Sequence, residues 1–138
     1  MKFRFRGRHE LTKLWVVGPG IEIREARNPV HDVDEAYIIN RGCYTEVEFD
    51  TVSQTTGFTE DDGNEVFDGD IVEFVYQDEG FGEMRESFLV EFNKDRGKFV
   101  LKLLQSGFVE SIDTLNSPEY KHVIGNKWDT PELMKQAV

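Results

Sequence analysis

The chain has 138 residues, a net charge of −11 and one cysteine, and its apolar fraction of 38% includes 11 Phe, 4 Tyr and 2 Trp. This length fits one domain that buries roughly two-thirds of its unfolded surface, and the aromatic side chains favour sheet. No stretch approaches the ~20 apolar residues of a membrane span, and the basic N-terminus lacks the apolar region of a secretory signal. A lone Cys43 excludes an intrachain disulfide and a cysteine-rich zinc site, so we expect a reduced, cytoplasmic protein in which Cys43 is a small buried side chain.

Short strand patterns separated by turn residues run through the first 52 positions. Strands are predicted at residues 2–6, 14–17, 21–24, 36–39 and 44–52. The breaker Gly18-Pro19-Gly20 follows the second pattern, and Arg41-Gly42 predicts a turn between the last two. The polar residues 25–34 predict a loop, and this loop is the expected seam between an N-terminal hairpin region and the rest.

The charge is distributed unevenly. Residues 1–13 hold five basic groups and one acidic group, whereas the remaining residues hold 11 basic and 26 acidic groups, a balance of +4 against −15. A basic strip at the N-terminus is one hypothesis for an interaction surface, and it comprises Lys2, Arg4, Arg6 and Arg8. The alternation of Phe3 and Phe5 with basic residues favours the alternative, an ordinary strand with one wet face.

The segment 54–74 carries the strongest turn signals in the chain. Asp62-Gly63 predicts a tight hairpin, because aspartate tolerates a left-handed backbone and glycine adopts positive φ without steric cost. Asp68-Gly69 repeats the signal just before residues 71–76, which predict a buried strand. The surrounding carboxylates do not fit the ligand spacing of an EF-hand with either glycine at its sixth position. We therefore expect solvated turn carboxylates.

The last third of the chain predicts further hairpins and little helix. Strands are expected at residues 86–92, 99–104, 108–112 and 120–124, a spacing typical of a barrel or sandwich. Thr130 followed by Pro131 and Glu132 is a helix start signal, so a short C-terminal helix is expected.

Catalytic and metal-binding patterns do not emerge from this sequence. His9, His31 and His122 stand in no metal-ligand spacing, and Gly80-Phe81-Gly82 precedes no helix that could form a phosphate-binding loop. We therefore predict no enzymatic activity, no metal and no cofactor.

Three blocks of the sequence form a combined motif. The opening reads Lys2-Phe3-Arg4, and it continues as Phe5-Arg6-Gly7-Arg8 and Trp15-Val16-Val17-Gly18. The centre runs from Thr56-Gly57-Phe58 to Gly69-Asp70-Ile71-Val72, and the end reads Val123-Ile124-Gly125-Asn126 with Pro131-Glu132-Leu133. In this order the blocks resemble the YopX-like proteins of bacteriophages and prophages, some members of which have the same variant of the opening.

The resemblance covers essentially the whole chain and implies a mainly β fold with an SH3-like barrel and no assigned enzymatic activity. It implies one domain over residues 1–138, with an N-terminal β-hairpin region, residues 1–30, packed on the barrel. Acidic residues replace the lysines that relatives often carry around the central hairpin. We interpret the motif residues as fold-defining; they are Gly57, Asp62, Gly63, Gly69, Asp70, Ile71, Val72, Gly125, Asn126 and Pro131.

The favoured function is therefore a non-catalytic interaction module that binds a phage or host protein, without membrane contact. One alternative is an acidic decoy that occupies the basic site of a nucleic-acid-binding protein, since the chain beyond residue 13 is strongly acidic. Weak nucleic-acid binding through the basic strip ranks lower, because an acidic protein repels a phosphate backbone. Homo-oligomerisation stays open.

Overall fold

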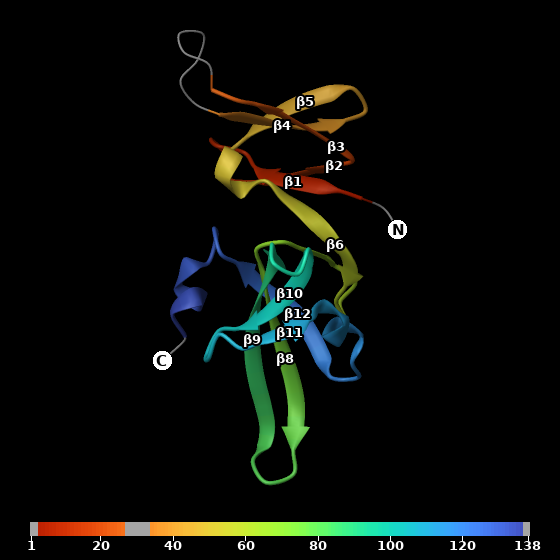
Figure 1. Cartoon of the computed structure of the whole chain (residues 1–138), viewed down its shortest axis with the longest axis vertical. Helices are drawn as coiled ribbons and strands as arrows, with labels where there is room; N and C mark the ends of the chain where they lie inside the picture. The colour runs from red at the N-terminus through yellow and green to blue at the C-terminus, as the bar shows by residue number, and fades with distance from the viewer. Residues whose placement is uncertain (1–2, 27–33, 137–138) are drawn as a thin grey trace. The chain divides into compact units, whose positions relative to one another are not determined.

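The structure is a computed structural model that describes residues 3–26 and 34–136. It is mainly β, as the sequence predicts, and its short helices within the described residues are all of the 3₁₀ type. The chain divides into two compact units, Met1–Thr55 and Thr56–Val138. Each unit is described by itself below (Figure 1).

The first unit contains two groups of paired strands. β1 (Phe5–Arg8) pairs antiparallel with β2 (Trp15–Gly18) and with the start of β6 (Ser53–Thr59), the strand that continues into the second unit. A three-stranded antiparallel sheet follows, in the order β3 (Gly20–Arg24), β4 (Glu35–Asn40) and β5 (Cys43–Val47). The 3₁₀ helix η1 (Phe49–Thr51) connects β5 to β6. The predicted loop at 25–34 lies mostly outside the described residues.

The core of the first unit is small and depends on a glycine. Ala36, Ile38 and Val47 are buried, and partly buried apolar side chains of β1, β2 and the η1–β6 connection pack on them. A Cβ atom at Gly7 would lie 2.3 Å from Cγ2 of Val47, far inside van der Waals contact. Gly7 therefore lets β1 lie directly on the core.

The predicted wet face of the N-terminal strand is wrong in detail. Phe3 is 62% exposed, whereas Arg6 is buried at 8% exposure. The Nε of Arg6 donates a hydrogen bond to Ser53 Oγ at 3.0 Å, and the guanidinium lies 4.5 Å from the ring centre of Trp15. A hydrogen bond and a cation–π contact offset the desolvation of this charge, and alternation alone does not reveal them.

The second unit is built on a five-stranded antiparallel sheet. Its order is β11 (Val109–Ser111), β10 (Lys98–Leu103), β9 (Gly82–Asn93), β8 (Asp70–Asp78) and β12 (Tyr120–Asn126). β7 (Glu65–Phe67) lies beside β6 in the sheet order, so the segment 54–74 folds as strand, hairpin, short strand, turn and core strand. The 3₁₀ helix η2 (Ile112–Asn116) connects β11 to β12.

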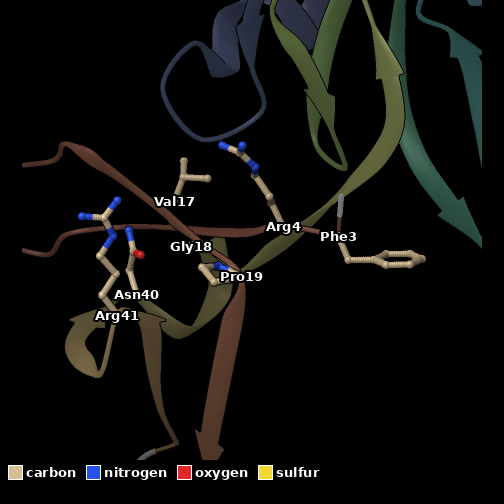
Figure 2. Close-up of a pocket in the computed structure, with 7 residues that line it drawn as sticks. All are labelled: Phe3, Arg4, Val17, Gly18, Pro19, Asn40 and Arg41. Carbon is tan, nitrogen blue, oxygen red and sulfur yellow. The ribbon is translucent and has the colours of Figure 1, made fainter. Parts of the chain in front are cut away.

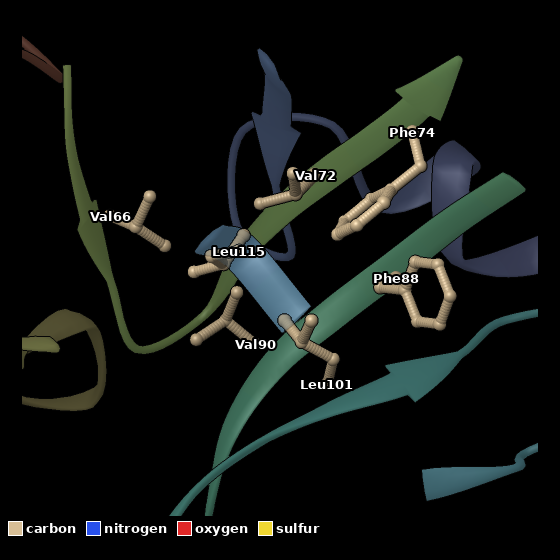
Figure 3. Close-up of a cluster of buried hydrophobic side chains, with 7 residues drawn as sticks. All are labelled: Val66, Val72, Phe74, Phe88, Val90, Leu101 and Leu115. Atoms are coloured by element: carbon tan, nitrogen blue, oxygen red, sulfur yellow. The ribbon is translucent and has the colours of Figure 1, made fainter. Parts of the chain in front are cut away.

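Two apolar clusters stabilise this sheet. The larger one consists of Val66, Val72, Phe74, Phe88, Val90, Leu101 and Leu115 (Figure 3). Within it the rings of Phe74 and Phe88 meet edge to face with centroids 5.0 Å apart, an arrangement that contributes about 0.5–1.5 kcal/mol beyond burial. The smaller cluster joins buried Ile71, Leu89 and Leu104 to side chains of the C-terminal segment.

The short C-terminal helix predicted at Thr130-Pro131 is not confirmed in the expected form. Residues Pro131–Gln136 form a 3₁₀ helix, η3, and the Oγ1 of Thr130 donates to the carbonyl of Asn126 at 2.9 Å and accepts from its N–H at 3.0 Å. The Thr130 hydroxyl therefore bonds back to Asn126, the last residue of β12, and not to the N–H groups of the helix. An SH3-like barrel stays a prediction.

Candidate interaction site

The motif residues at 69–72 shape the entry into the core strand. Gly69 has φ +92°, and a Cβ there would lie 2.4 Å from the ring of Trp128. The Oδ2 of Asp70, which is 2% exposed, accepts a hydrogen bond from the N–H of Phe67 at 2.8 Å, closing the turn between β7 and β8. Ile71 and Val72 follow as fully buried core residues. These four residues therefore have a structural role: Gly69 and Asp70 fix the backbone of the turn, and Ile71 and Val72 contribute side chains to the core of the second unit.

The second half of the motif shapes the end of β12. The register of β12 against β8 shifts between Val123 and Gly125, and a Cβ at Gly125 would lie 2.1 Å from Oγ1 of Thr130. The side chain of Asn126 accepts hydrogen bonds from the N–H groups of Trp128 and Asp129 at 3.0 and 2.8 Å. The structure thus places Gly125 and Asn126 at the end of β12, where they form a tight turn with Thr130, and it places Pro131, which is exposed, at the start of η3.

The acidic turn between β6 and β7 is exposed from residue 61 to residue 64, as expected of solvated turn carboxylates, but Glu60 departs from that expectation. Glu60 is 4% exposed, and its carboxylate accepts hydrogen bonds from the N–H of Asn64 at 2.8 Å and of Val123 at 3.0 Å. The next carboxylate, Asp61, accepts from the N–H of Lys121 at 2.8 Å. These two side chains therefore fasten the turn to β12.

Gly57 and Gly63 have φ of +85° and +90°, values that favour glycine, and they flank this acidic turn. The remaining motif residue here, Asp62, is exposed, and its carboxylate accepts from the hydroxyl of Tyr120 at 2.8 Å. That hydrogen bond raises the pKa of Tyr120, because it is lost when the phenol ionises.

The predicted basic strip is largely engaged within its own unit. Lys2 lies outside the described residues. Arg6 is buried against Ser53 and Trp15, and Arg8 forms an ion pair with Glu48 at 2.9 Å. Arg4 is half-buried and lines a pocket.

This pocket is a hollow of about 550 Å³ in the first unit. Its lining residues come from the N-terminal segment, the β2–β3 corner and the β4–β5 turn; they are Phe3, Arg4, Val17, Gly18, Pro19, Asn40 and Arg41. Figure 2 shows the side chains of Asn40 and Arg41 extending in the same direction from their turn, with Arg4 and Val17 on the same side and the Phe3 ring pointing away. Two guanidinium groups and a carboxamide therefore line one hollow.

The turn that carries Arg41 has an unusual composition. Asn40 pairs with Cys43, so Arg41 and Gly42 form a two-residue hairpin loop, with φ of 51° and 78°. Two positive φ values define the type I′ turn, in which asparagine or glycine is preferred. An arginine in this conformation costs roughly 1–2 kcal/mol. Cys43, expected to be buried, is exposed beside this turn.

In the second unit, the β8–β9 hairpin extends beyond its neighbouring strands. The pairing of β12 with β8 ends at Tyr120 and Val75, and that of β10 with β9 ends at Leu103 and Phe88. The β8–β9 pairing itself continues to Asp78 and Gly82. Residues 76–78 and 82–86 therefore form a two-stranded ribbon that projects from the sheet (Figure 1).

The tip of this ribbon presents one aromatic side chain. Phe81 is 82% exposed. The Oδ1 of Asp78 accepts hydrogen bonds from the N–H groups of Gly80 and Phe81 at 2.8 and 3.1 Å, which orders the loop. Residues 76–86 contain four acidic groups and one arginine, a net charge of −3. The sequence places Gly80-Phe81-Gly82 in a polar loop, residues 77–83, between two predicted strands, and it excludes a phosphate-binding loop there, but it does not single out Phe81 as the exposed side chain of the hairpin tip.

Metal coordination finds no support in the part of the chain that the structure describes. Residues 3–26 and 34–136 contain no group of three or more His, Cys, Asp or Glu side chains placed to hold a metal ion. The same residues contain no helix that is long and apolar enough to cross a membrane.

Comparison with known proteins identifies the family. The sequence pattern described as "YopX protein" matches residues 4–135. The chain belongs to the YopX family. This family member is similar in structure to protein EF1440 from Enterococcus faecalis, known from a crystal structure, with 20% identity and a TM-score of 0.52 over 96% of this chain and 98% of that chain. At this identity the likeness shows the fold alone. Comparison with curated proteins gives no match.

Proposed function

We propose that this YopX family member is a non-catalytic interaction module of phage or prophage origin that binds a phage or host protein through the β8–β9 hairpin. The observation that carries the proposal is the ordered hairpin tip, which presents Phe81 at 82% exposure. An aromatic side chain on a pre-organised loop can fill a pocket on a partner with little loss of conformational entropy. A cytoplasmic setting in a bacterial host accords with this role.

The charge of the second unit indicates what kind of partner fits. Residues 1–55 hold 8 basic and 9 acidic groups, whereas residues 56–138 hold 8 basic and 18 acidic groups. The second unit therefore carries −10 of the total charge of −11. Complementary charge accelerates association and excludes partners of like charge. We infer a protein partner with an apolar pocket bordered by basic residues.

The test compares capture by the intact chain and by two variants. Phe81→Ser removes the aromatic anchor, whereas Phe108→Ser is the matched control at a residue that is 63% exposed elsewhere in the unit. A true partner binds the wild type and the Phe108→Ser variant and binds Phe81→Ser at least about tenfold more weakly, since a central aromatic anchor typically contributes 2 kcal/mol or more. Partners that do not distinguish the two variants would refute the hairpin as the binding surface.

A second candidate function is the acidic decoy, and the charge of −10 in residues 56–138 favours it. It differs from the first only in the identity of the partner, which would be a nucleic-acid-binding protein. Oligonucleotide then competes with this chain for the partner, and the affinity falls steeply as salt is added. Capture that neither oligonucleotide nor salt weakens would exclude the decoy and leave the first proposal intact.

A further inference from the structure

The pocket of the first unit has the chemistry of an anion-binding site. Arg4, Asn40 and Arg41 bring two guanidinium groups and a carboxamide to a hollow whose other walls include Val17 and Pro19. Guanidinium groups present planar donors that match the oxygens of carboxylates and phosphates. The apolar walls suit a hydrocarbon body attached to such a head group.

The conformation of Arg41 is an independent reason to consider this pocket functional. A strained residue persists where the surrounding structure requires it, and such residues cluster at binding sites. The turn needs only positive φ at position 41, which asparagine or glycine adopts at lower cost than arginine. Arginine at this position therefore does not serve the turn, but it supplies a charge to the pocket that the turn residues line.

We propose that this pocket binds a small organic anion that carries a carboxylate or phosphate head group on an apolar body. A volume of about 550 Å³ lies within the range of about 300–1,000 Å³ that is usual for small-molecule sites. The site lies in the nearly neutral first unit and is separate from the protein-binding hairpin proposed above.

The experiment is a titration of the full ¹⁵N-labelled chain monitored by NMR. The probes are phenyl phosphate, benzoate, inorganic phosphate and neutral benzyl alcohol. Phenyl phosphate or benzoate should produce saturable shifts of the amide signals of Gly18, Asn40, Arg41 and Gly42. The stronger of the two probes assigns the head group, and weaker binding of inorganic phosphate shows that the apolar walls contribute.

Variants separate the site from a nonspecific effect of charge. Arg41→Asn preserves the turn, and Arg4→Gln removes the second charge; each should weaken binding of the better anion at least about tenfold, the effect of losing one charge-assisted hydrogen bond. Arg24→Gln is the control, since Arg24 pairs with Glu22 at 2.9 Å and does not line the pocket. Absence of saturable shifts with either anion, equal binding of benzyl alcohol, or affinity unchanged in both pocket variants would overturn the proposal.

Discussion

The carboxylate of Glu60 accepts a hydrogen bond from the backbone N–H of Val123 at 3.0 Å, although 63 residues separate them. Its other oxygen accepts from the N–H of Asn64 at 2.8 Å, within the hairpin that Glu60 begins. One buried carboxylate thus satisfies backbone donors of two segments and fastens the β6–β7 turn to β12. A residue type typical of solvated turns has a structural role here.

Replacing Glu60 by glutamine should therefore destabilise the protein although the shape is nearly unchanged. The amide has one acceptor oxygen, so one of the two N–H groups would face an NH₂ group and lose its partner. An unsatisfied buried donor costs about 1–3 kcal/mol. Urea unfolding of Glu60→Gln should show a loss in this range, whereas Glu132→Gln, at an exposed position, should stay within about 0.5 kcal/mol of the wild type. Equal stability of the two variants would contradict the structural role of Glu60.

Two glycines separate the cost of a left-handed backbone from the cost of a steric clash. Gly63 and Gly69 have nearly equal φ, +90° and +92°. A Cβ at Gly63 meets nothing within 4 Å, whereas one at Gly69 meets the ring of Trp128 at 2.4 Å. Gly63→Ala should cost about 1–2 kcal/mol for the backbone alone, and Gly69→Ala should add about 1–3 kcal/mol for overpacking. Chemical denaturation of both variants measures the difference, and equal losses would rule out the contact with Trp128.

The ion pairs of Glu48 predict a dependence of stability on pH. Hydrogen bonds from Lys13 and Arg8 lower the pKa of Glu48 below its ordinary value of 4.5. The stabilisation is therefore fully present above pH 4.5 and is lost as the pH falls through the lower pKa of the folded state. Glu48→Gln should lower the free energy of unfolding at pH 7 by roughly 0.5–1 kcal/mol, and the difference from wild type should shrink in acid. The exposed Glu10→Gln is the control; a difference that does not change with pH would contradict the assignment.

Local signals explain which parts of the fold were predictable. The Asp62-Gly63 and Asp68-Gly69 pairs mark turns in which the glycines, and not the aspartates, adopt positive φ, and the apolar run after the second pair forms the core strand β8. The mainly β character follows from the same short-range patterns. Two strands differ from their predicted ranges: the one predicted at 2–6 is observed at Phe5–Arg8, and the one predicted at 44–52 ends at Val47, before the 3₁₀ helix η1.

Two of the errors, at Arg6 and Glu60, originate in partners that are distant in sequence. Arg6 can be buried because its guanidinium donates a hydrogen bond to Ser53 and contacts the ring of Trp15. Glu60 can be buried because the backbone N–H of Val123 in β12 donates a hydrogen bond to its carboxylate. The periodicity of the sequence does not reveal hydrogen bonds or ring contacts between residues that are far apart in the chain. The pocket was missed for the same reason, since its lining comes from three separate segments. One local signal was present: Arg41-Gly42 stands where a tight hairpin favours Asn-Gly.

The presence of arginine at position 41 of this turn leads to a prediction about stability that does not depend on any ligand. Arginine at φ 51° has a strained backbone, which lowers the free energy of unfolding. Asparagine avoids most of this strain, because its short polar side chain tolerates the left-handed region. Arg41→Asn should therefore raise the free energy of unfolding by about 0.5–1 kcal/mol, and Arg41→Val should lower it, since a β-branched residue is least tolerant of positive φ. Urea unfolding at several salt concentrations checks this order and separates the backbone effect from the loss of charge. If asparagine proved neutral or destabilising, the side chain of Arg41 would contribute interactions that offset the strain of its backbone.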